Sequence, residues 1–213
     1  MHQQHLKKYP LLEQDVPSLA ERHEIVAGQA MTAEVKCLRP VERVGVVYDL
    51  LRHTSHGNFP IIDTASSGIL YGTTSRSMLC TLLQRRAFCR NKEGYMTDDY
   101  KDGFWQSKRL LPLVQWETIE KAYPNYPSID SVELRPGDRH NWIDLRPYAN
   151  TAPYTVNETA SIQRTYRLFR TLGLRFLCVV NYNNQLVGII TRDDLLPKSL
   201  WNAIMRGRSA HLG

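Results

Sequence analysis

The sequence contains one pattern twice, and this repeat restricts the possible folds more than any other feature. The stretch from Cys37 to Leu79 returns from Thr155 to Leu195 with the same order of apolar runs and turn residues. Matching positions lie 118 residues apart as far as the first hairpin strand, and 116 apart from Gly72 and Gly188 onward. One supersecondary unit used twice cannot bury its apolar face alone, so the repeat predicts two copies packed as a pair.

Each copy has the order β-α-β-β-α, so we expect an α/β (α+β) fold with two tandem domains. The first copy is predicted to have a helix over 41–53, strands over 59–62 and 69–73, and a helix capped by Ser75 that ends near Arg85. The second is predicted to have a helix over 158–171 closed by Gly173, strands over 176–181 and 186–190, and a last helix capped by Thr191 and interrupted at Pro197.

Composition shifts along the chain predict the domain boundaries. Charged residues and glycines over 91–108 indicate a mobile stretch, whereas aromatic residues and prolines over 116–144 indicate an ordered connector. We expect a lead-in segment over 1–30, a first domain over 31–89, a linker over 90–145, a second domain over 146–198 and a tail over 199–213.

The composition is that of an ordinary globular protein, with 42% hydrophobic and 23% charged residues in a chain of 213. Apolar runs such as 176–180 are far shorter than the roughly 18 residues of a membrane span. The polar start over 1–8 lacks the apolar core of a signal peptide. We therefore expect a soluble polypeptide, which can still be a piece of a larger protein.

Residue patterns give no support for an enzyme. The four cysteines form no C-x-x-C pair, and the seven histidines show no metal-ligand spacing. No nucleophile–base pair or pair of catalytic carboxylates is evident, so we expect no catalytic residues, no metal and no catalytic cofactor. Buried, reduced thiols are expected at Cys37, Cys80, Cys89 and Cys178.

The net charge of +6 and the pI of 9.2 leave two interpretations open. A basic protein can bind nucleic acid, or it can face the anionic surface of a membrane. The basic residues are scattered and form no recognition motif with interleaved aromatics. We therefore expect no nucleic-acid partner; a steep salt dependence of RNA or DNA binding would indicate one.

Two such units, with the Gly-hydrophobic-hydrophobic-Thr-x-x-Asp ending of the second copy, resemble a CBS-domain pair, also called a Bateman module. Finer matches resemble the cytoplasmic C-terminal region of CLC chloride channels and chloride/proton exchangers. The segment 150–156 fits the endosomal–lysosomal branch of that family. The other matching stretches are 9–13, 58–62, 123–127, 168–175 and 187–195.

The resemblance implies a regulatory module of a chloride transporter on the cytosolic face of an endosomal, lysosomal or vacuolar membrane. Its implied partners are the transmembrane part of the same transporter, a second copy in a homodimer, and ATP, ADP or AMP as a regulatory ligand. An alternative stays open, in which the module no longer binds nucleotide and serves only dimerisation and trafficking.

In the second copy, Thr191, Arg192, Asp193 and Asp194 offer the groups that an adenosine phosphate requires. Helix-opening N–H groups favour anions, and the Thr191 hydroxyl can donate to a phosphate oxygen. Asp194 can accept from both ribose hydroxyls. Arg192 can steer phosphates, whereas Asp193 replaces a basic residue found in relatives. The other interpretation is an ordinary N-cap with an acid in the first turn.

By resemblance to nucleotide-binding CLC modules, the first copy supplies the base slot. His56 stacks on the base in this interpretation; in another it is an exposed residue at a helix end. Backbone groups of the first strand of this copy, expected over 35–37, and of the segment 56–60 are expected to face the adenine edge. The residues are Val35, Cys37, His56, Gly57, Asn58, Phe59 and Pro60.

The mirror-related site is expected to be inactive. Ser75 and Met78 align with Thr191 and Asp194. A thioether cannot hold ribose hydroxyls as a carboxylate does, so the sequence predicts one nucleotide per chain.

Overall fold

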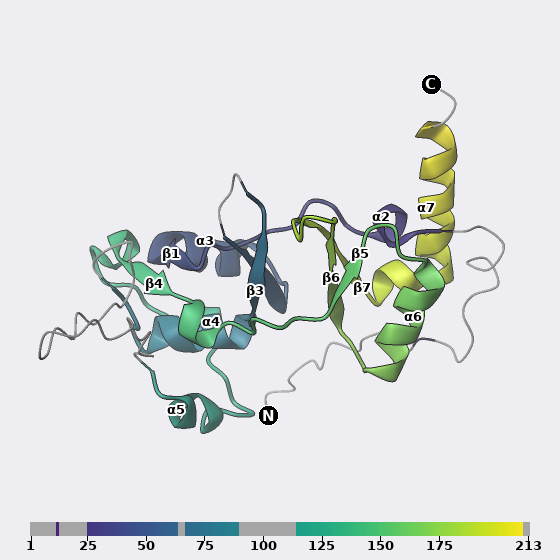
Figure 1. The fold of residues 1–213 in the computed structure, drawn as a ribbon. Helices are drawn as coiled ribbons and strands as arrows, with labels where there is room; N and C mark the ends of the chain where they lie inside the picture. Colours follow the sequence, from purple (N-terminus) through teal and green to yellow (C-terminus); the bar gives the residue numbers. More distant parts are fainter. Residues whose placement is uncertain (1–11, 13–24, 64–66, 90–113, 211–213) are drawn as a thin grey trace, which may run out of the picture. The chain divides into compact units, whose positions relative to one another are not determined.

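Figure 1 shows the computed structural model, which describes residues 12, 25–63, 67–89 and 114–210. The chain divides into two compact units. The first-repeat unit comprises residues 36–152, and the second-repeat unit comprises residues 1–35 together with 153–213. The mixed α/β fold expected from the repeat is confirmed.

The first-repeat unit is built on an antiparallel hairpin of β2 (Asn58–Ile62) and β3 (Leu70–Ser75). Helices α3 (Val44–His53) and α4 (Arg76–Gln84) bury their apolar faces in one core with this hairpin. The remaining elements of the unit are β1 (Val41–Arg43), α5 (Trp116–Glu120), β4 (Trp142–Asp144) and the 3-10 turns η1 (Ile129–Ser131), η2 (Asp138–His140) and η3 (Arg146–Tyr148).

Long-range pairing changes the predicted start of the first copy. The helix predicted over 41–53 begins only at Val44, because Val41–Arg43 pairs with β4 as a short strand. The strand expected over 35–37 is absent, and the residue that follows it, Leu38, makes a single parallel bridge with Ile61. The predicted cap of the next helix is confirmed, since the Ser75 hydroxyl accepts the N–H of Met78 at 3.1 Å.

The second-repeat unit is built on a three-stranded sheet. Strand β5 (Thr155–Asn157) pairs in parallel with β6 (Phe176–Val180), which pairs antiparallel with β7 (Leu186–Thr191). The other elements are α2 (Ala27–Ala30), α6 (Ile162–Thr171), the 3-10 turn η4 (Asp193–Leu195) and α7 (Pro197–Ala210). One apolar core includes side chains from α2, α6, β6 and α7.

Capping residues decide the ends of helix α6. It was predicted to begin at Glu158, but the Ser161 hydroxyl accepts the N–H of Arg164 and starts the helix at Ile162. The predicted end is confirmed: Gly173 has φ 61, and the N–H of Leu174 returns to the carbonyl of Phe169 at 3.1 Å. This six-to-one bond is the Schellman motif.

The chain after β7 differs from the prediction. No α-helix opens at Thr191; the three-residue turn η4 comes next. Pro197 begins α7 and does not interrupt a helix. Proline is well suited to the first turn of a helix because its missing N–H would have no partner within the helix there.

In each repeat, a segment from elsewhere in the chain crosses the strand at the glycine that the two copies share, Gly72 or Gly188. Asn150 exchanges two backbone hydrogen bonds with Thr73, both 2.9 Å long, and Thr32 does the same with Ile189 at 2.9 and 3.0 Å. A Cβ at Gly72 would lie 2.5 Å from the carbonyl oxygen of Asn150. Gly188 would meet the Thr32 carbonyl at 2.9 Å. Glycine is therefore required at this point of the pattern because another backbone passes directly over it.

Residues 25–35 thus pack with the second repeat although they precede the first. The connector over 116–144 is ordered as expected and contributes Ile129, Val132 and Ile143 to the core of the first-repeat unit. The domain boundaries given above stay a prediction, and the stretch 91–108 lies outside the described residues. Within the part of the chain that the structure describes, no helix has the length and apolarity to cross a membrane.

A substitution at Gly72 tests the crossing. The Cβ of Gly72→Ala would overlap a backbone carbonyl that cannot rotate away, so we expect a loss of about 1–3 kcal/mol in the free energy of unfolding. Urea denaturation of the folded chain measures this loss. An unchanged denaturation midpoint would mean that the segment at Asn150 does not pass over Gly72.

A buried ion pair fixes the turn η2 to the end of α4. The Arg86 guanidinium donates to both carboxylate oxygens of Asp138 at 2.6 and 2.5 Å, and the N–H of Arg135 donates to the same group at 2.6 Å. Asp138 is 4% exposed. The hydrogen bonds from Arg86, more than the opposing effect of burial, hold the pKa of Asp138 below its ordinary value.

This pair predicts a loss of stability in acid. Because the folded pKa of Asp138 is depressed, its stabilising contribution is fully present above the unfolded value of about 3.9 and decreases as the pH falls toward the folded value. Asp138→Asn should lower the unfolding temperature at neutral pH, and its difference from wild type should shrink below about pH 3. Thermal unfolding across this range checks the trend; a difference independent of pH would contradict it.

Candidate functional site

Asp194 is held in a defined orientation at the end of β7. Its Oδ2 accepts the backbone N–H and the hydroxyl of Thr191, both at 2.7 Å. The hydroxyl of Thr32 donates to Oδ1 at 3.4 Å. A carboxylate has about four acceptor positions, so these contacts leave Asp194, which is half-buried, with capacity for another donor.

This geometry alters the prediction for phosphate. The Thr191 hydroxyl is directed to Asp194, and the α-helix expected to open at Thr191 is absent. The argument from a helix N-terminus therefore fails at this position, because a 3-10 turn of three residues has no comparable dipole. What the arrangement does provide is a fixed negative acceptor.

Arg192 and Asp193 lie beside this acceptor in the chain. The Nε of Arg192 donates to the carbonyl of Leu174, just beyond the end of α6, at 2.8 Å. The guanidinium is thus partly engaged in holding a helix end, and its expected role toward phosphate stays a prediction. Asp193 is exposed.

In the first-repeat unit, the expected base-facing segment follows the end of α3. His56 and Gly57 are exposed and Asn58 is half-buried. The His56 ring packs edge-on against Phe59, with ring centroids 6.3 Å apart. The Phe59 side chain is fully buried and Pro60 is buried too, so these two residues can offer only backbone groups.

Two other expected residues precede this segment. Val35 belongs to the second-repeat unit and Cys37 to the first-repeat unit, so the structure does not assign them to one element. The carbonyl of Pro60 accepts the N–H of Leu38 at 3.0 Å, which places the residue after Cys37 beside β2. The part of the predicted set that the structure brings together is therefore Cys37 with residues 56–60.

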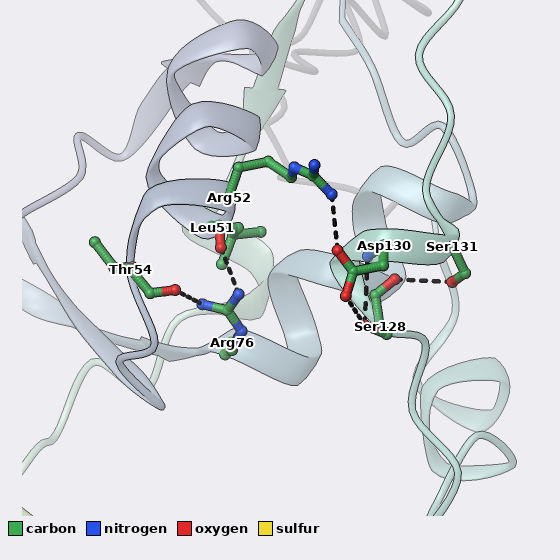
Figure 2. Close-up of polar contacts among 7 residues, drawn as sticks. All are labelled: Leu51, Arg52, Thr54, Arg76, Ser128, Asp130 and Ser131. Atoms are coloured by element: carbon green, nitrogen blue, oxygen red, sulfur yellow. Dashed lines mark hydrogen bonds and ion pairs between the residues drawn. The ribbon is translucent and has the colours of Figure 1, made fainter.

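Arg76 was not among the sequence predictions, yet it contacts both ends of segment 54–57, which contains the expected base-facing residues His56 and Gly57. Figure 2 shows its guanidinium pointing at the C-terminus of α3, where it donates to the carbonyl of Thr54 at 2.9 Å and to that of Leu51. Its backbone N–H donates to the carbonyl of Gly57 at 2.8 Å. The repeat contained one signal for it, since Arg76 lies 116 positions before Arg192.

The two repeats differ where Asp194 and Met78 correspond. In the first-repeat unit the side chain of Ser75 accepts the N–H of Met78 and caps α4. In the second-repeat unit the direction is reversed, because the side chain of Asp194 accepts from Thr191. Only the second arrangement presents a carboxylate.

Comparisons with known proteins define the class first. A family model described as CBS domain matches residues 145–199. The CBS-pair protein CBSX2 from Arabidopsis thaliana has a TM-score of 0.50 and 17% identity, over 86% of this chain and 99% of that chain. A putative acetoin utilization protein (AcuB) from Vibrio cholerae has a TM-score of 0.50 and 15% identity, over 87% of this chain and 98% of that chain. The chain is a CBS-domain pair.

Sequence relatives then narrow the class to the CLC family. The chain is 36% identical over 201 residues to the H(+)/Cl(−) exchange transporter 7 of Bos taurus and of Homo sapiens, covering 92% of this chain and 23% of each relative. It is 32% identical over 181 residues to the chloride channel protein CLC-c of Arabidopsis thaliana, covering 82% of this chain and 22% of that protein. The chain thus spans about a quarter of these relatives. It is a CBS pair of the CLC type, as the sequence resemblance indicated.

The environment of Cys37 gives a test of this part of the fold. Cys80, Cys89 and Cys178 are buried as expected, whereas Cys37 is only half-buried. This partial burial still raises the pKa of the Cys37 thiol to about 11. At about pH 8 only roughly one thiol in a thousand is ionised, and the thiolate is the reactive form. Iodoacetamide should therefore modify Cys37 slowly in the folded protein and quickly in urea, as read by peptide mass spectrometry. Equal rates in both states would show that the thiol is not buried.

Proposed function

We propose that the chain is the cytosolic regulatory module of a CLC-type chloride/proton exchanger or chloride channel, and that it binds one adenine nucleotide. The relatives named as exchange transporters and chloride channels support the transport context. The full transporter would contain a transmembrane part beyond this chain. Its placement on an endosomal, lysosomal or vacuolar membrane and its assembly as a homodimer belong to the same proposal.

The observation that carries the nucleotide proposal is the orientation of Asp194. Two bonds of 2.7 Å from Thr191 fix the carboxylate before any ligand arrives. An acceptor that is already ordered loses little side-chain entropy when it binds, and its bonds to hydroxyl donors are charge-assisted. A ribose with two neighbouring hydroxyls matches such an acceptor.

The base is assigned to the exposed segment His56–Asn58, where backbone groups can pair with the adenine edge and the His56 ring can stack. The remaining members of the expected set are Val35, Cys37, Phe59, Pro60, Thr191, Arg192 and Asp193. Solved CBS pairs support adenine nucleotides as the first ligands to test, because CBSX2, whose fold this chain shares, has also been crystallised with AMP.

Phosphates contribute least in this proposal. The bond of Arg192 to Leu174 and the absence of an α-helix N-terminus at Thr191 reduce the groups available to them. We therefore expect ATP, ADP and AMP to bind with similar affinities. Regulation would follow if one conformation of the module binds nucleotide better than another, and its size is limited by that difference in affinity.

A second candidate is a module that binds no nucleotide and serves dimerisation and trafficking of the same transporter. One observation favours it: the bonds between Thr191 and Asp194 also stabilise the turn after β7 without any ligand. The experiment below separates the two candidates.

Asp194→Asn tests the ribose contact. The amide oxygen can still accept from Thr191, so the turn should persist, but the charge that strengthens bonds to the ribose is lost. Calorimetric titration with ATP should give one nucleotide per wild-type chain and an affinity at least about tenfold weaker in the variant. Wild type should also prefer ATP to 2′-deoxy-ATP, and the variant should lose that preference.

Asp63→Asn is the matched control, because it removes one exposed carboxylate from the β2–β3 turn and should leave ATP binding unchanged. A wild-type chain that binds no adenine nucleotide would leave the scaffold as the function. Two nucleotides per chain would contradict the assignment of an inactive mirror site at Met78.

A further inference from the structure

The base-facing segment depends on a residue outside it. Segment 54–57 leaves the end of α3 and enters β2, and His56 and Gly57 are exposed. Arg76 contacts both ends of this segment. Its guanidinium donates to the carbonyl of Thr54 and to that of Leu51 in the last turn of α3, and its backbone N–H donates to the carbonyl of Gly57. One residue of the neighbouring strand–helix junction thus sets where the segment begins and ends.

The position of Arg76 has an electrostatic cost that its contacts offset. It is the first residue of α4, where the helix dipole disfavours a cation, and the first turn contains no acidic residue. The guanidinium is turned instead toward the C-terminus of α3, whose free carbonyls and negative dipole end favour a cation. The planar fork of arginine can serve two carbonyls at once, which the single nitrogen of lysine cannot do in the same geometry.

A neighbouring arginine makes a useful contrast. Arg52, also at the end of α3, pairs with Asp130 of η1 at 2.7 Å, and both side chains are exposed, at 46% and 79%. Figure 2 shows this pair directed to the connector and not to the 54–57 segment. The two arginines therefore carry the same charge at the same helix end, but only Arg76 contacts the ends of the segment.

We propose that Arg76 is a positioning residue for the recognition of the adenine base, acting by holding segment 54–57 in the conformation that presents the backbone of His56–Asn58. The inference rests on the proposed function and extends it to base selectivity. Arg76 itself touches neither base nor phosphate. A substitution of the side chain removes the two guanidinium bonds at the start of the segment and keeps the backbone bond to Gly57. The start of the segment is then free to move, so the backbone that distinguishes adenine from guanine is no longer ordered before binding.

The test compares Arg76→Gln, Arg76→Lys and the control Arg52→Gln by calorimetric titration with ATP and with GTP, well below the unfolding temperature of each protein. Arg76→Gln should weaken ATP binding about tenfold and reduce the preference for ATP over GTP by a similar factor. Arg76→Lys should fall between Arg76→Gln and wild type, and Arg52→Gln should keep the wild-type preference. If Arg76→Gln kept the wild-type ratio of affinities for ATP and GTP, the proposal would be overturned.

Hydrogen exchange of the amides over 54–58 in the ligand-free protein provides a second measurement. Exchange should be faster in Arg76→Gln and unchanged in Arg52→Gln. A wild-type chain that binds no nucleotide overturns the proposed function, and the base-recognition role falls with it. Even without nucleotide binding, faster exchange over 54–58 in Arg76→Gln would show that Arg76 orders the segment. Unchanged exchange would show that Arg76 does not order it.

Discussion

The crossing of one backbone over a glycine is the contact on which the rest of this fold depends. At Gly72 and again at Gly188, a segment from elsewhere in the chain passes so closely that a Cβ would overlap its carbonyl. The same two-bond bridges, Asn150 to Thr73 and Thr32 to Ile189, lock both crossings. Because β3 and β7 continue directly from these crossings, the crossings fix the strand ends from which Arg76 and Thr191 project.

The two repeats use that shared framework differently. After β3, the chain turns at once into a nine-residue helix whose first arginine is directed to the end of the helix before it. After β7, the chain makes a short turn that a carboxylate closes, and α7 starts only at Pro197. The two repeats have different side chains at one corresponding position, the thioether of Met78 in the first and the carboxylate of Asp194 in the second. Only the second strand–helix junction is therefore a candidate ligand site. The arginine that follows each strand makes a similar contact, since Arg76 donates to the carbonyl of Thr54 after α3 and Arg192 to that of Leu174 after α6.

Local signals were sufficient for most of the helices and hairpins. The Ser75 cap and the Gly173 terminus follow from residue types that suit one backbone geometry and few others. The misplaced helix start in the first copy has a different origin. Strand β1 exists only because β4 pairs with it, and the paired residues Arg43 and Trp142 are 99 positions apart in the sequence. Arg76 was missed for the same reason, because its carbonyl acceptors lie 22 and 25 residues away. Residue patterns also placed an α-helix at Thr191, where the side chain of Asp194 prefers to close a turn.

The discontinuous make-up of the second-repeat unit sets an order of events during synthesis. Residues 36–152 form one uninterrupted compact unit, whereas residues 25–35 need partners that follow residue 153. Domains fold as units while the ribosome extends the chain. Residues 36–152 can therefore fold completely before the partners of residues 25–35 have been synthesised. Residues 25–35 form the four-residue helix α2 and two single-residue bridges but no strand, so they expose little unpaired strand edge to neighbouring nascent chains before the second repeat is made.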